Sequence, residues 1–118
     1  MDIQKVERVD KPWGHEEILI QTNNYVMKRI TITRGKRMSL QYHEQKEETI
    51  YVISGTLIVW KSEDFYDHIT LDSNDVYHVV PRQVHRFGAP DHNDTVILEC
   101  STTQLTDVVR LADDFNRT

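Results

Sequence analysis

The sequence of 118 residues contains only one cysteine, Cys100, so no disulfide can form within the chain. A solitary cysteine usually behaves as a small apolar residue, and we expect Cys100 to be buried. Without a disulfide framework, the chain fits a reducing compartment, and we expect a cytoplasmic protein.

Long apolar runs and an excess of positive charge are missing as well. No stretch approaches the ~20 apolar residues of a membrane span, and the opening MDIQKVERVDKPWG lacks the apolar run of a signal peptide. The net charge of −5 disfavours nucleic acid, which requires a surplus of Lys and Arg on one face. We therefore expect neither a membrane nor a nucleic acid as partner. A small anionic ligand held by two or three arginines remains compatible with this charge.

No helical period persists before Ser101. Instead, β-rich runs alternate with turn residues, and the two runs that flank Ser54-Gly55 indicate a hairpin. Strands are expected at 16–21, 25–33, 38–43, 49–54, 56–62, 68–72, 76–80, 84–89 and 95–100. Short strands at this spacing are typical of an all-β sandwich or barrel, and a double-sheet jelly roll is the natural small solution. The length fits a single domain over residues 1–118, with a helical or extended tail at 105–118.

Four polar side chains in these runs could bind a metal. Gln41 and His43 are two residues apart in a strand, so their side chains leave the same face. Glu48 opens the next, otherwise apolar strand, where an inward carboxylate without a partner is costly. His85 starts a later strand. Two histidines, one carboxylate and one amide oxygen suit a single divalent ion such as Zn, Mn, Fe or Ni. The alternative for His43 is an ordinary hydrogen-bonded histidine of a strand.

The spacing around these residues resembles the first motif of the cupin superfamily, Gly-x5-His-x-His-x3–4-Glu-x6-Gly. Here Gly35, Gln41, His43, Glu48 and Gly55 occupy the five positions, with glutamine in place of the first histidine. The resemblance selects Glu48 rather than its neighbour in the Glu-Glu pair.

Three further segments extend the resemblance over nearly the whole chain. KPWGHEEIL, VPRQVHRF and DVVRLADDFNR are similar to the head, the second motif and the tail of one cupin group. That group is the C-terminal cupin domain of type II mannose-6-phosphate isomerase/mannose-1-phosphate guanylyltransferase, which also has the string LSLQ-x-H. Two departures stand out: the segment Pro81 to His85 is one residue shorter than the usual motif and lacks its glycine, and Phe115-Asn116 replaces a Tyr-Gly pair.

The resemblance implies a double-stranded β-helix that binds its metal through Gln41, His43, Glu48 and His85. It also implies a metal-dependent isomerase of the mannose 6-phosphate/fructose 6-phosphate type, in which Arg86, Arg110 and Arg117 contact the sugar phosphate. Nucleotidyl transfer is not expected, because the guanylyltransferase part is missing. The catalytic base remains open, with His78 as one candidate.

Two other functions are compatible with the sequence. The chain could be a non-catalytic cupin that binds a metal or a sugar, because fold does not decide function. Less support exists for an Fe(II) oxygenase, which would need open metal positions. A homodimer is expected, because an exposed edge strand must be covered or paired and small cupins are commonly dimers.

Overall fold

The computed structural model describes residues 3–118, and all of its regular structure is β-strand. None of the described residues belongs to a helix long and apolar enough to span a membrane. The strands are β1 (Glu7–Lys11), β2 (Gly14–Gln21), β3 (Val26–Ile32), β4 (Leu40–Tyr42), β5 (Glu48–Ser54), β6 (Leu57–Trp60), β7 (His68–Leu71), β8 (Val76–Val79), β9 (Arg86–Gly88), β10 (Thr95–Ser101) and β11 (Val109–Ala112).

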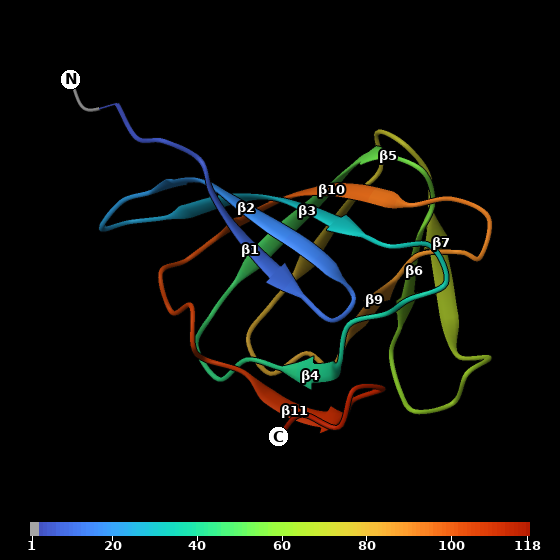
Figure 1. Cartoon of the computed structure of the whole chain (residues 1–118). Coiled ribbons are helices and arrows are strands. Elements are labelled where there is room, and N and C mark those ends of the chain that lie inside the picture. Colours follow the sequence, from blue (N-terminus) through green and yellow to red (C-terminus); the bar gives the residue numbers. More distant parts are fainter. Residues whose placement is uncertain (1–2) are drawn as a thin grey trace.

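The strands form two layers. One is an antiparallel sheet in the order β1-β2-β3-β10-β5-β8, and the other consists of the sheets β7-β6-β9 and β11-β4. Isolated bridges, Arg37 with Gly88 and Gln41 with His85, join the two parts of the second layer. Figure 1 shows β4 and β11 below the six-stranded sheet in that view. The expected all-β, double-stranded β-helix is confirmed.

The interior is apolar at one end of the central strands and charged at the other. Side chains of β3, β5 and β10 alternate between buried and more exposed positions, as expected for strands with one face on a core. Pairing places Ile97 of β10 opposite both Ile30 and Val52, which belong to the hydrophobic core. Two residues further along β10, Glu99 lies opposite Lys28 of β3. The charged end is the region that forms the candidate site.

All nine predicted runs contain a strand, and the structure adds β1 and β11. The sequence of β1, ERVDK, is charged and mostly exposed, so it carries no clear apolar alternation. In the tail, β11 adopts the extended alternative by pairing with β4.

The predicted hairpin at Ser54-Gly55 is wrong. Strand β5 pairs with β10 and β8, whereas β6 pairs with β7 and β9, so the chain crosses from one layer to the other at this point. Gly55 makes the crossing with φ of 80°, and a Cβ atom there would lie 2.6 Å from the carbonyl oxygen of Asp94. Turn residues alone do not distinguish a hairpin from such a crossing.

The expectation that Cys100 is buried is also wrong. Its neighbours Glu99 and Ser101 are buried, and the alternation of β10 therefore directs Cys100 to the exposed outer face of the sheet.

Candidate metal centre

Backbone pairing brings three distant segments to the charged end of the barrel. Gln41 and His85 exchange two backbone hydrogen bonds, of 3.0 and 2.9 Å, so their side chains leave the same face side by side. Glu48 enters the interior from β5 in the opposite layer. The intervening turn is fixed by Asp107, whose carboxylate accepts hydrogen bonds from the backbone N–H groups of residues 44–46.

His43, Glu48 and His85 converge in this space. The Nε2 atoms of His43 and His85 lie 3.0 and 3.2 Å from the same atom, Oε1 of Glu48. The three residues are almost inaccessible to solvent, at 3%, 2% and 0% exposure. Among the described residues, they form the one group of three or more His, Cys, Asp or Glu ligand atoms close enough to share an ion.

The hydrogen bonds of the two imidazoles leave their lone pairs directed at Glu48. Nδ1 of His43 is 2.6 Å from the carbonyl oxygen of Asp107, and Nδ1 of His85 is 2.9 Å from that of Gln83. A carbonyl oxygen only accepts, so each Nδ1 carries a proton. In the neutral form of each ring, Nε2 is then the atom free to bind a metal, and both Nε2 atoms face the Glu48 carboxylate. His85 Nε2 has no hydrogen-bond partner among the described residues.

This arrangement fits a divalent cation. Ligand nitrogen and oxygen atoms at about 2.0–2.2 Å from one ion lie about 2.8–3.6 Å from each other, from octahedral to tetrahedral geometry, and this range includes the observed separations of 3.0 and 3.2 Å. Nδ1–H bonds to carbonyls are the usual way in which metal-binding histidines are oriented. Gln41 accepts a 2.7 Å hydrogen bond from Ser39 Oγ at its Oε1, and that oxygen keeps a second lone pair. The chemistry of the donors therefore matches the expected mixed N/O set.

A buried network of charges surrounds Glu48. Burial alone would raise the pKa of Glu48, but Glu99, the two facing imidazoles and the charge of Lys46 hold it well below its usual range. Burial raises the pKa of Glu99 well above normal, and the charge of Glu48 adds to the effect. Lys46 Nζ lies 3.4 Å from Glu99 and 3.7 Å from Glu48, and these carboxyl groups raise its pKa despite its burial. The pKa values of Glu48 and Glu99 are therefore shifted in opposite directions.

A cavity of about 260 Å³ opens beside these groups. Gln41 and His43 line it next to the candidate metal site. Its other charged lining residues are five cations and two carboxylates: Lys11, Lys28, Lys46, Arg110, Arg117, Glu16 and Glu99. The surplus of positive charge suits an anionic ligand.

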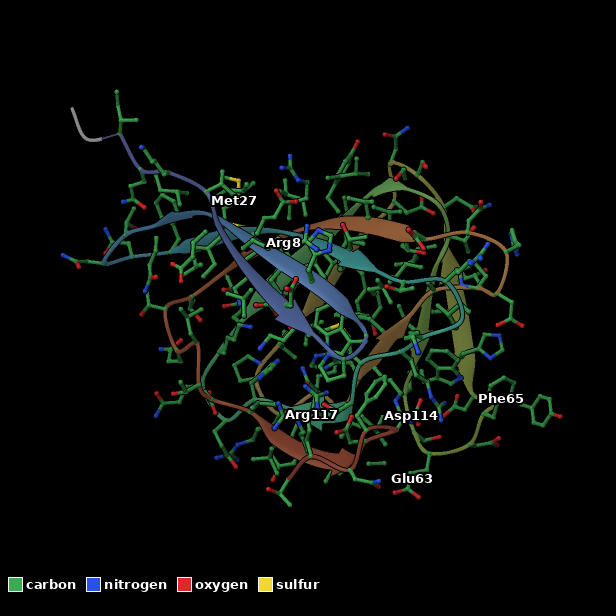
Figure 2. The ribbon with its side chains drawn as sticks, viewed as in Figure 1. Arg8, Met27, Glu63, Phe65, Asp114 and Arg117 are labelled. Carbon is green, nitrogen blue, oxygen red and sulfur yellow. The ribbon has the colours of Figure 1, made fainter. Side chains whose placement is uncertain are left out.

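The three predicted phosphate-binding arginines separate in the structure. Arg110 and Arg117 line the cavity, and Figure 2 labels Arg117 near the C-terminal segment. Arg86 is not among the lining residues. Its buried guanidinium donates to the carbonyl oxygen of Met38 and to Asp114, which anchors the tail.

His78, the candidate base, lies away from this cavity. Its ring is half exposed, with Nδ1 2.8 Å from Thr49 Oγ1 and Nε2 2.7 Å from Glu47. It is paired with Thr49 on the outer face of the β5–β8 pair, so it is not brought to the metal centre.

The sequence reasoning missed four charged residues of the cavity, three of them buried and one partly buried: Lys28, Lys46, Glu99 and Glu16. For two of them, Lys28 and Glu99, the sequence pattern did contain an indication of burial. In β3 and β10, Lys28 and Glu99 fall in register with buried Ile30 and Ile97, the same pattern that singled out Glu48. Lys46 lies in a charged turn that looked solvated, and only the tertiary contacts bury it.

Comparisons with known proteins agree with this architecture. A mannose-1-phosphate guanylyltransferase of Salmonella muenchen is 30% identical over 106 residues, which cover 87% of this chain and 22% of that enzyme. The chain thus spans less than a quarter of the length of this relative. Two solved structures share the fold: a Klebsiella pneumoniae protein with a double-stranded β-helix domain (TM-score 0.74, 17% identity, 91% and 90% of the two chains) and a cupin-2 domain protein of Shewanella frigidimarina (TM-score 0.64, 18% identity, 80% and 85%).

A family model described as "Mannose-6-phosphate isomerase C-terminal" matches residues 1–113. The match covers the head, the two histidine-bearing segments and the tail up to Asp113. This chain has the cupin-type double-stranded β-helix fold and belongs to the family of mannose-6-phosphate isomerase C-terminal domains.

Proposed function

We propose that this chain is a metal-dependent sugar-phosphate isomerase that interconverts mannose 6-phosphate and fructose 6-phosphate. The observation that carries the proposal is the convergence of two imidazole Nε2 atoms on Glu48 beside a cation-lined cavity. Membership in the isomerase C-terminal family supports the substrate class.

In the proposal, His43, Glu48 and His85 hold one divalent ion, with Gln41 as the fourth ligand. When bound, such an ion supplies a Lewis acid that stabilises negative charge on the sugar oxygens during isomerisation. The chain contributes rigidity, because the carbonyls of Asp107 and Gln83 fix the two imidazoles and burial excludes water.

Aldose–ketose exchange moves a proton between neighbouring carbons and requires a group that takes and returns it. Glu99 is the buried carboxyl group that lines the cavity beside the metal residues. In the proposal, the Glu99 carboxylate takes this proton from one carbon and returns it to the neighbouring carbon. Glu99→Gln keeps the shape of the side chain and should lower kcat by about 10²–10⁴-fold while metal content stays unchanged.

The phosphate is proposed to bind at the cationic side of the cavity that β11 and the tail contribute. Arg110 favours this role, because its Nε is buried without a hydrogen-bond partner among the described residues. Arg117 also lines the cavity but is already paired with Asp113 through two side-chain hydrogen bonds. Arg110→Met should therefore weaken the binding of inorganic phosphate more than Arg117→Met does.

The proposal is tested with purified protein that has been stripped of metal and reloaded separately with Zn, Mn, Fe or Ni. Conversion of mannose 6-phosphate to fructose 6-phosphate should require metal and should be lost in His43→Ala, Glu48→Gln and His85→Ala together with bound metal. His78→Ala is the matched control and should retain both.

Three outcomes would redirect the assignment. Absence of turnover of any hexose phosphate by metal-loaded protein would reject isomerisation, and a retained affinity for sugars would then favour a binding protein. Uptake of O₂ with Fe(II) would favour an oxygenase. Unchanged metal affinity in all three ligand variants would reject the metal site itself.

A further inference from the structure

A second pair of buried charges, distinct from the metal ligands, faces the same cavity. Lys28 Nζ lies 3.1 Å from Glu16 Oε1, and the side chains are only 10% and 13% exposed. The apolar side chain of Ile18 lines the cavity beside them. The two residues are on neighbouring strands, β3 and β2, and within residues 3–118 they form no side-chain hydrogen bond or ion pair with the candidate metal ligands.

This ion pair leaves much of its hydrogen-bonding capacity unused. An ammonium group has three donors and a carboxylate has two acceptor oxygens. Among the described residues, Lys28 donates one side-chain hydrogen bond, to Glu16 Oε1, and Glu16 Oε2 accepts none. Burying an ion pair is costly unless the remaining donors and acceptors are satisfied. A polar ligand in the cavity would satisfy them.

The position of the pair fits the far end of a ligand that is held at the metal centre. Lys28 is directly opposite Glu99 on β10, and β10 in turn pairs with β5, which carries Glu48. Two steps between adjacent strands correspond to about 10 Å. Arg110, the residue favoured for the phosphate, reaches the cavity from β11 in the other layer. The three groups therefore approach the cavity from separate elements.

We propose that Glu16 and Lys28 determine specificity by recognising two neighbouring hydroxyl groups of the sugar. This inference rests on the proposed function for the class of ligand. Lys28 donates to one hydroxyl oxygen, and Glu16 Oε2 accepts from the O–H of the next. A neighbouring pair of hydroxyl groups offers both an oxygen that accepts from Lys28 and an O–H that donates to Glu16. Recognition of a phosphate or of a metal ion does not need this combination of a donor and an acceptor. Sites built to bind a hydroxyl group discriminate strongly against ligands that lack it.

The experiment compares two double variants by titration calorimetry. Glu16→Met with Lys28→Met removes the inward pair, and Glu17→Met with Arg29→Met removes an outward pair on the same two strands, 2.7 Å apart. Replacing a buried ion pair by apolar residues of similar volume usually preserves or increases stability, so the first variant should fold. Each protein is titrated with mannose 6-phosphate and with inorganic phosphate, and its metal content is measured.

We expect the inward variant to bind mannose 6-phosphate at least tenfold more weakly than the wild type, with unchanged affinity for inorganic phosphate and unchanged metal content. The outward variant should match the wild type throughout. Equal affinity of the inward variant and the wild type for mannose 6-phosphate would overturn the inference, and so would a parallel loss of phosphate affinity. The single variant Lys28→Met replaces the double variant if the latter does not fold.

The same measurements separate this inference from the proposed function. A wild type that binds mannose 6-phosphate through the inward pair but does not isomerise it rejects the isomerase and leaves the inference standing. A wild type that isomerises the sugar, with an inward variant of equal affinity, rejects only the inference. A wild type that binds no hexose phosphate rejects both.

Discussion

At the candidate centre, the positions of the protons on the His43 and His85 rings decide whether their short contacts with Glu48 can hold a metal. Because the Nδ1 atoms of His43 and His85 donate to backbone carbonyls, both Nε2 atoms face the Glu48 carboxylate and, in the neutral rings, can bind a metal. The same contacts between protonated rings would be simple ion pairs. The buried, unpartnered Nε2 of His85 favours the metal interpretation.

Arg82 carries the clearest local strain near this centre. Gln83 N–H donates to the carbonyl of Val80, and Pro81 and Arg82 occupy the middle of the turn, with φ of 67° at Arg82. Turns with Pro at the second position and positive φ at the third favour glycine there. Left-handed backbone costs a side-chain-bearing residue about 1–2 kcal/mol, so Arg82→Gly should raise the free energy of unfolding by about 1 kcal/mol.

Urea titration of the metal-free protein measures this change. Val84→Gly, in the same segment, is the control and should lower stability. A lower urea midpoint for Arg82→Gly would mean that the exposed ion pair of Arg82 with Glu44, at 3.5 Å, outweighs the strain.

At the scale of elements, the segment before β11 supports the metal centre without providing a side-chain ligand. Asp107 binds the backbone of residues 44–46 through its carboxylate and the His43 ring through its carbonyl. Asp107→Ala should release the turn and lower metal affinity roughly 10–100-fold, as is typical for outer partners of metal ligands. Competition with a chromogenic chelator measures the affinity. Glu63→Ala, an exposed residue of equal charge, should have no effect, and equal affinities of both variants would contradict the supporting role.

The tail beyond β11 is held by an ion pair that depends on pH. Hydrogen bonds from the Arg117 side chain lower the pKa of Asp113 from 3.8 to about 2. A lowered pKa in the folded state means that the stabilisation is complete above about 3.8, the unfolded value, and is lost as the pH falls toward 2. Asp113→Asn should therefore have a lower Tm than the wild type at pH 7, and this difference should shrink as the pH falls below about 3.8 and be mostly lost by pH 2. A difference at pH 2 as large as that at pH 7 would show that the ion pair is not its cause.

For the whole molecule, metal binding should be visible as stability. A ligand that binds only the folded state at roughly 100 times its Kd adds about 2.7 kcal/mol to the free energy of unfolding. We expect this increase when Zn or Mn is added to the wild type, measured by denaturant titration with and without chelator. His85→Ala should show little increase, whereas His78→Ala should respond like the wild type. Equal responses in both variants would place the bound metal elsewhere.

The expected homodimer stays a prediction. Strand β8 ends the six-stranded sheet, and Val76 on it is 60% exposed beside Tyr51 of β5. If two copies associate through this edge, Val76→Lys should produce monomers in sedimentation velocity experiments, because charged side chains block edge pairing. Val6→Lys is the control, because Val6 is exposed near the N-terminus, and this variant should sediment like the wild type. A wild type that sediments as a monomer contradicts the dimer.

Local sequence patterns determined the strands and much of the candidate centre. β-rich runs separated by turn residues identified nine strands, and the two-residue period of a strand placed Gln41 and His43 on one face. An isolated carboxylate on an apolar strand drew attention to Glu48, and the resemblance to the cupin motif selected it rather than its neighbour. These features involve residues close together in the chain, so the amino-acid sequence alone reveals them.

The tertiary structure decided which faces point inward and which strands are neighbours. A period of two shows that Cys100 and Glu99 lie on opposite faces, but only pairing with β3 and β5 makes the Glu99 face the interior. In the same way, packing of the tail directs Arg86 to Asp114 and Arg110 to the cavity, and it buries Lys46. Such contacts join residues distant in the chain, and their energies depend on burial and charge around each group, which no local pattern records.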